Sequence, residues 1–258
     1  MNRSGFRTDA LAFSYLDAGG KGQPLIALHA HWMEGLTFAP LADALAPDWR
    51  VIALDQRGHG YSDHPPTYTR ADYIYDIEAL FEHLGLKEAV VLGNSLGGVN
   101  AYQFAARHPD QVKALIIEDV GVEVSTDISF ALPWAGPFAS REALVERIGP
   151  RLAPYLEDSF RHNRRGWHLA FDPQDMVVSQ SFLNGDHWKD WLATTCPALV
   201  IRGSDSKVTD ADQMEEMAAR RPNTSLRTLG GGHVVHVDNP VGFTEAVKTF
   251  LVSCPSMG

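Results

Sequence analysis

The chain has 258 residues, of which 45% are hydrophobic and 21% charged, values typical of soluble globular proteins. Its formal net charge of −10 argues against nucleic acids and anionic membranes as partners, because both attract basic surfaces. No apolar run reaches the ~20 residues that a transmembrane helix needs. The two cysteines, Cys196 and Cys254, match neither a disulfide framework nor a metal-binding spacing, so the composition predicts a cytoplasmic globular protein.

Five short runs rich in Val, Ile and Leu predict strands that are buried on both faces of a parallel sheet. They span residues 24–29, 50–55, 88–93, 113–119 and 197–203. Apolar residues at helical spacing predict helices between and after them, over residues 73–86, 96–108, 211–221 and 241–251. This alternation of strand and helix predicts an α/β fold with a doubly wound, mostly parallel sheet.

The alternation breaks between residues 121 and 192. This segment contains five prolines and four of the six tryptophans but no run typical of a buried strand, and residues 140–148 have a helical pattern. We expect a helical excursion that either packs on the sheet or covers a site at the strand ends. The four tryptophans are Trp134, Trp167, Trp188 and Trp191.

Residues 93–97 read G-N-S-L-G, a match to G-x-S-x-G. A predicted strand leads directly into this motif and a predicted helix follows it, which is the setting of a nucleophile elbow. Glycines two positions on either side of Ser95 allow strand and helix to pass closely. The helix N-terminus would present N–H groups to a developing oxyanion. The alternative is an ordinary turn in which Ser95 only caps the helix.

A serine nucleophile needs a base and an acid that orients the base. His233 follows three glycines after a predicted strand at 225–229 and precedes the last predicted helix. That position puts it on a loop at a strand end, from which it can approach Ser95. His236 has a more apolar setting, and we interpret it as structural.

Together these motifs resemble those of the α/β-hydrolases over nearly the whole chain. The similarity includes the elbow, the G-H-x-x-H-x-D-x-P stretch at 232–240, the D-x-R-G-x-G-x-S loop at 55–62 and the H-L-G-L stretch at 83–86. The resemblance implies a core domain of residues 1–120 and 193–258 and a helical cap of residues 121–192. It also implies scaffold roles for residues 57–60.

Two carboxylates are candidates for the acid of the triad. Most members of the family carry it as G-x-x-D after the next-to-last strand, but here Ser206 stands at that position and Asp205 lies one residue earlier. Asp119 ends the strand next to the nucleophile strand, and Asp119-Val120-Gly121 resembles the D-[IV]-[GAS] of short bacterial esterases. We therefore predict Asp119, with Asp205 as the alternative. Glu118 should face the opposite side of its strand.

The resemblance places the oxyanion hole at the backbone N–H groups of Leu96 and His31. The family usually has His-Gly in the second loop, where this chain has His29-Ala30. We expect Trp32, together with Trp134 and Trp167 of the cap, to line the substrate pocket, and His29 to be structural. The residues after His31 do not continue a zinc-hydrolase pattern, and neither a dinucleotide fingerprint nor a P-loop is present.

The sequence thus predicts a serine hydrolase of carboxylic esters or lactones that works through an acyl-enzyme and needs no cofactor or metal. Its aromatic cap favours a small apolar or aromatic substrate. Two alternatives remain open, because members of one fold differ in function. One is a carbon–carbon bond hydrolase or lyase with the same triad, and the other is a small-molecule receptor in which hydrolysis is vestigial. The oligomeric state is also left open.

Overall fold

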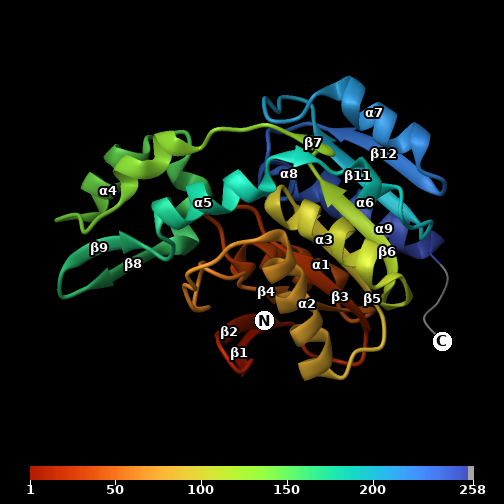
Figure 1. The fold of residues 1–258 in the computed structure, drawn as a ribbon, viewed down its shortest axis with the longest axis horizontal. Coiled ribbons are helices and arrows are strands. Elements are labelled where there is room, and N and C mark those ends of the chain that lie inside the picture. Colours follow the sequence, from red (N-terminus) through yellow and green to blue (C-terminus); the bar gives the residue numbers. More distant parts are fainter. Residues whose placement is uncertain (255–258) are drawn as a thin grey trace.

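The computed structural model describes residues 1–254, so residues 255–258 of the predicted core domain lie outside the described residues. Within residues 1–254 the main sheet has eight strands in the order β1-β2-β4-β3-β5-β6-β11-β12 (Figure 1). From β4 to β12 neighbouring strands are parallel, whereas β1 and β2 are antiparallel additions at one edge. The strands are β1 (Asn2–Arg7), β2 (Ala12–Asp17), β3 (Gln23–Leu28), β4 (Trp49–Leu54), β5 (Ala89–Asn94), β6 (Val112–Glu118), β11 (Ala198–Gly203) and β12 (Thr224–Leu229).

Helices cover both faces of this sheet. The helices α1 (Ala39–Leu45) and α9 (Pro240–Ser253) contribute apolar residues to one core cluster. The helices α2 (Arg70–Leu84), α3 (Leu96–Arg107) and α7 (Ala211–Arg220) contribute to the cluster on the other face. The doubly wound, mostly parallel sheet predicted from the alternating pattern is therefore confirmed.

Residues 121–192 form short elements after β6. They are β7 (Glu123–Val124), a 3-10 helix (Ser129–Trp134), α4 (Arg141–Ile148), a second 3-10 helix (Ala153–Ser159), β8 (Phe160–Asn163), β9 (Gly166–Leu169), α5 (Pro173–Leu183), β10 (Gly185–Asp186) and α6 (Trp188–Trp191). The hairpin β8–β9 lies beside α4 at the end of the molecule remote from α7 (Figure 1). The predicted helix at 140–148 is present as α4, whereas the four short strands were not expected.

Other elements also differ from the sequence prediction: strands β1 and β2 and helices α1 and α8 (Val235–Asp238) were not predicted. Strand β1 lies at the sheet edge, and Phe6 is its one buried side chain. The strand therefore lacks the apolar run that is typical of a central strand.

No helix in residues 1–254 combines the length and the apolar character needed to cross a bilayer.

Candidate active site

Ser95 lies in the sharp turn between β5 and α3. Its φ of +53° and ψ of −115° lie outside the regions that non-glycine residues adopt without strain. The turn can be this tight because its neighbours are glycines. A Cβ on Gly93 would lie 2.1 Å from the carbonyl oxygen of Gly97, and one on Gly97 would lie 2.1 Å from that of Leu28. The glycines of the motif are thus required by the close approach of three backbone segments.

Asp119 and His233 meet at the carboxyl ends of β6 and β12. Nδ1 of His233 lies 2.7 Å from Oδ2 of Asp119. Because a carboxylate only accepts hydrogen bonds, Nδ1 is the donor, and in the neutral ring Nε2 is then the acceptor nitrogen. The fully buried Asp119 carboxylate accepts three more hydrogen bonds: from Ser206 Oγ at 2.6 Å, Thr209 Oγ1 at 3.0 Å and the Gly203 N–H at 3.0 Å. Four donors stabilise the negative charge and fix the orientation of the carboxylate.

The alternative acid, Asp205, has a different environment. Its side chain is exposed, and its Oδ1 accepts a hydrogen bond of 3.3 Å from Ser204 Oγ. Among the residues that the structure describes, no hydrogen bond or ion pair joins it to His233. Of the two candidate acids, the structure brings Asp119 to His233.

A second acid–histidine pair lies on the opposite face of the sheet. Glu118 accepts from Nδ1 of His236 over 2.8 Å and from the backbone N–H of His236, also over 2.8 Å. Nε2 of His236 lies 2.7 Å from Thr37 Oγ1, and the ring stacks on Phe38 at 4.7 Å between centroids. Because Phe38 belongs to the core cluster under α1 and α9, Glu118 points away from Ser95, as expected from strand alternation.

Two backbone N–H groups lie where the sequence predicts an oxyanion hole. Leu96 is the first residue of α3, and His31 follows β3. Within residues 1–254 neither N–H donates to another protein group. Trp32, Ser95 and Asp119 are three of the four non-glycine residues with positive φ in the same range, so backbone strain is concentrated around this site.

The His31 side chain is buried and held in a hydrogen-bonded chain. Its Nε2 lies 2.9 Å from Ser179 Oγ, which lies 2.8 Å from the hydroxyl of Tyr73. Burial, with a smaller effect of nearby His59 and Arg70, lowers the pKa of His31 well below its usual range, so the ring is neutral at pH 7.

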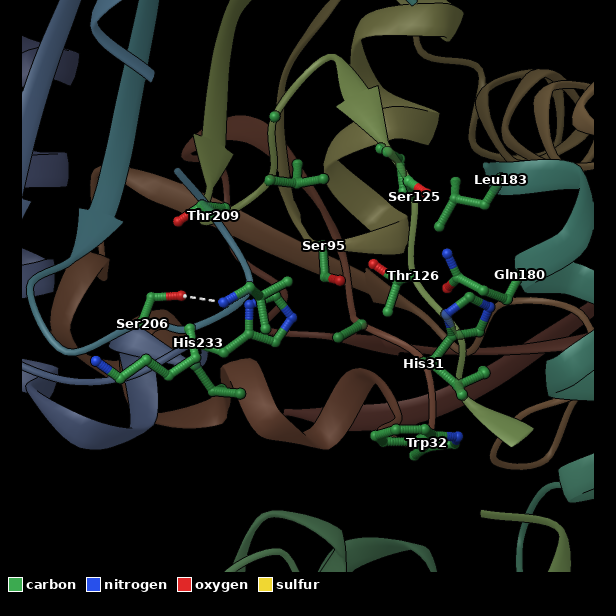
Figure 2. A pocket seen from close by; sticks show the side chains of 18 of the residues that line it. His31, Trp32, Ser95, Ser125, Thr126, Gln180, Leu183, Ser206, Thr209 and His233 are labelled. Carbon is green, nitrogen blue, oxygen red and sulfur yellow. Dashed lines mark hydrogen bonds between the residues drawn. The ribbon is translucent and has the colours of Figure 1, made fainter. Parts of the chain in front are cut away.

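Ser95 and His233 line the same cavity, which has a volume of about 540 Å³. In Figure 2 Ser95 lies between His233 on one side and His31 and Trp32 on the other. Most of the wall is apolar and comes from the strand ends and from residues 121–192; its apolar members include Trp32, Met33, Val120, Ile128, Phe130, Leu156 and Leu183. A cavity of this size and lining fits a small organic molecule.

The family model for the alpha/beta hydrolase fold matches residues 23–240 of the chain. The chain belongs to this family. The 2-(acetamidomethylene)succinate hydrolase of Mesorhizobium japonicum is 28% identical over 247 residues, covering 90% of this chain and 89% of that protein. An sn-1-specific diacylglycerol lipase of Mus musculus is 24% identical over 263 residues, covering 93% of this chain and 85% of that protein.

A solved structure of E-2-(acetamidomethylene)succinate hydrolase is similar to this α/β-hydrolase over 98% of this chain and 100% of that one, with a TM-score of 0.87 and 25% identity. The comparisons therefore support a hydrolase of this family.

The structure corrects the prediction for two of the pocket tryptophans. Trp32 lines the Ser95 cavity, but Trp134 and Trp167 are not among its described lining residues. Trp134 is 3% exposed and packs edge-on behind Trp32, with 5.1 Å between ring centroids. Trp167 lies in β9, where its backbone exchanges hydrogen bonds of 2.7 and 2.8 Å with Phe138. The Trp134 ring thus contacts Trp32 and Phe130, and the Trp167 ring lies 5.1 Å from that of His162, measured between ring centroids.

Sequence reasoning missed several residues at this site. Thr126, Gln180 and Leu183 line the cavity. Thr126 lies in an irregular stretch, and Gln180 and Leu183 lie in α5, a helix that the sequence pattern did not predict. Ser206 and Thr209 were missed as donors to Asp119. A signal was present for Ser206, because a hydroxyl group at the family's usual acid position is suited to donate to a carboxylate nearby.

Proposed function

We propose that this α/β-hydrolase cleaves a carboxylic ester or lactone, with Ser95 as nucleophile, His233 as general base and Asp119 as the acid that orients His233. The observation that carries the proposal is the 2.7 Å hydrogen bond from His233 Nδ1 to Asp119, in a cavity that His233 shares with Ser95. That bond directs the unprotonated Nε2 away from the acid, as a base for a serine hydroxyl requires.

In this mechanism His233 Nε2 takes the Ser95 proton while Oγ attacks the carbonyl carbon of the substrate. The carbonyl oxygen becomes an oxyanion, and the N–H groups of Leu96 and His31 stabilise it. When the tetrahedral intermediate collapses, His233 protonates the leaving alcohol and the acyl group stays on Ser95. A water molecule that loses a proton to His233 then attacks the acyl-enzyme, which releases the acid and restores Ser95.

We further propose that residues 121–192 act as the cap, because Ile128, Phe130 and Leu183 of this segment line the cavity with Ser95. The substrate is then a small molecule with an apolar acyl or alkyl part. The lipase named among the relatives supports ester cleavage. The other relative is named for a succinate, so acyl groups that carry carboxylates are the main alternative within this class.

The free cysteines Cys196 and Cys254 support the cytoplasmic location expected from composition.

The test combines active-site labelling with a substrate panel. A fluorophosphonate probe should label the protein, and Ser95→Ala should abolish labelling and turnover of p-nitrophenyl valerate. The matched control is Ser4→Ala, an exposed serine of β1, which should label as the natural chain does. Labelling that persists in Ser95→Ala would contradict the proposal.

The same panel separates the alternatives. It contains aryl esters of varied acyl length, lactones and vinylogous diketones. Cleavage of the diketones in preference to the esters would favour a carbon–carbon bond hydrolase. Tight binding with negligible turnover of every compound would favour a receptor.

A further inference from the structure

The charged side chains that line the Ser95 cavity are mostly acidic. Three acidic residues, Glu123, Asp205 and Asp210, and one basic residue, Lys207, are part of the lining. Oε1 of Glu123 accepts from Trp188 Nε1 over 2.8 Å, and Oδ1 of Asp210 caps α7, but both residues keep a negative charge. No arginine is among the described lining residues. Sites that bind organic carboxylates commonly use guanidinium groups, because these match a carboxylate with two parallel hydrogen bonds. The cavity has no such group.

The two histidines of the cavity do not replace the missing guanidinium. Burial keeps His31 neutral, and its Nε2 already faces Ser179 at 2.9 Å. Nδ1 of His233 donates to Asp119, and the reaction needs its other nitrogen as a base. Neither ring is therefore available as a permanent cation for a substrate carboxylate.

The guanidinium groups near the loop of His31 and Trp32 are engaged elsewhere. That of Arg70 donates to Gln103 Oε1 over 3.0 Å and to Asn100 Oδ1. Arg3 and Arg161 both pair with the buried carboxylate of Glu34. Both also lie over the ring of Tyr61, at 4.2 and 4.4 Å from its centroid. Turning either group toward the cavity would leave Glu34 buried with less compensation, which is unfavourable.

The polar groups that do face Ser95 are neutral. Figure 2 shows Thr126 and Gln180 across the cavity from His233. Nε2 of Gln180 donates one of its two N–H groups to Asn184 Oδ1 over 2.8 Å, which leaves one N–H and the carbonyl oxygen for a substrate. These groups suit neutral polar groups of a substrate and carry no positive charge that would balance a carboxylate.

We propose that this cavity selects esters and lactones whose acyl and alcohol parts carry no negative charge. This inference rests on the proposed hydrolase function and narrows its substrate class. A carboxylate entering the cavity would lose hydration without gaining a guanidinium partner, and it would pass the carboxylates of Glu123, Asp205 and Asp210. A neutral substrate meets neither cost.

The test uses two aryl esters of equal acyl length. In p-nitrophenyl valerate the acyl chain ends in a methyl group, and in mono-p-nitrophenyl glutarate it ends in a carboxylate. We expect kcat/KM to be about tenfold or more higher for the valerate at low ionic strength. The ratio should fall as salt is added, because Glu123, Asp205 and Asp210 are exposed and salt screens their charges. Equal values, or a higher value for the glutarate, would overturn the proposal.

Variants identify the groups responsible. The double variant Glu123→Gln/Asp205→Asn should lower the valerate-to-glutarate ratio about two- to threefold, because it removes two repelling charges. Glu215→Gln, which removes an exposed carboxylate of α7 outside the lining, should leave the ratio unchanged. If Lys207→Met reduced kcat/KM for the glutarate alone by tenfold or more, Lys207 would be a carboxylate anchor and the proposal would be wrong.

Binding to Ser95→Ala protein separates this inference from the function. Equilibrium binding of both esters does not depend on turnover, and we expect the valerate to bind about tenfold more tightly. If neither ester is hydrolysed by the natural chain but this preference holds, the hydrolase function fails and the charge selection stands. If both are hydrolysed but bind equally, the charge selection fails and the function stands.

Discussion

Two walls of the Ser95 cavity differ in how firmly their side chains are held. The first wall comes from the sheet, and the second comes from residues 121–192. On the sheet side Asp119 accepts four hydrogen bonds, and both Ser95 and Asp119 have positive φ values that their surroundings impose. On the other side Thr126 and Phe130 are exposed and lie in or between short elements, although Gln180 and Leu183 of α5 are buried. The first wall therefore fixes the proposed chemistry, whereas the second can change with little effect on it.

The largest expected effect is that of Asp119→Asn, which removes a negative charge from the first wall. The amide is isosteric, but it cannot orient the imidazole as a carboxylate does. Turnover of p-nitrophenyl valerate should fall about 10⁴-fold, as in a trypsin-like triad, with the melting temperature nearly unchanged. Asp205→Asn is the control and should cost about twofold or less, because that carboxylate is exposed. A comparable loss in both variants would contradict the role of Asp119.

The next effect concerns the backbone beneath Ser95. Gly97→Ala would place a Cβ 2.1 Å from the carbonyl oxygen of Leu28, so strand or helix must shift. We expect it to lower the free energy of unfolding by about 1–3 kcal/mol or more, measured by urea denaturation, and to reduce turnover. Gly230→Ala has 3.8 Å to its nearest neighbour and serves as the control. Equal stability of the two variants would show that the close approach can relax.

A smaller effect is expected for Ser206→Ala. The variant loses the 2.6 Å bond to Asp119 but keeps those from Thr209, Gly203 and His233. A hydrogen bond to a charged group contributes about 1.5–3 kcal/mol of stabilisation. If part of this stabilisation is lost from the transition state, kcat should fall about tenfold. KM for p-nitrophenyl valerate should not change. Ser204→Ala, in an exposed serine that bonds Asp205, should keep kcat, and a change confined to KM in Ser206→Ala would refute the positioning role.

The smallest effect on chemistry should come from the second wall. Phe130 and Trp134 both pack edge-on against Trp32, at 5.7 and 5.1 Å, but Phe130 is 55% exposed and Trp134 is 3% exposed. Phe130→Ala should alter the preference for acyl length several-fold and change stability by about 0.5 kcal/mol or less. Trp134→Ala should cost about 3–5 kcal/mol. Ratios of kcat/KM across the ester series and thermal melts would test both expectations, and similar melting temperatures would contradict them.

The parts of the molecule that sequence predicted well have strong local patterns. The central strands are continuous apolar runs, and the turn at Ser95 needs glycines at fixed spacing. Both features can therefore be recognised in the sequence. The neighbouring strand order also brought Asp119 forward as a candidate. The sequence favoured Asp119 but left Asp205 as an alternative, because a loop can absorb a shift of one residue.

The remaining parts lack such patterns for physical reasons. Strand β1 is polar because its side chains are mostly exposed at the sheet edge. Much of the cavity wall from residues 121–192 uses 3-10 helices and strands of two to four residues, which are too short to show a period. Helix α5 is longer, but its apolar residues are not gathered on one face. Tryptophan is also ambiguous, because a large apolar ring suits both a pocket and a core. Here Trp32 lines the cavity, whereas Trp134 and Trp167 are not among its described lining residues.

The adjacent carboxylates at the end of β6 have a consequence for how this chain can vary in length. Glu118 and Asp119 engage His236 and His233 on opposite faces of the sheet, so the number of residues between the two histidines is fixed by two contacts at once. One inserted or deleted residue there would break at least one pair. The exposed turn of the β8–β9 hairpin, at residues 164–165, has no such constraint and is where natural insertions or an engineered label can be accommodated.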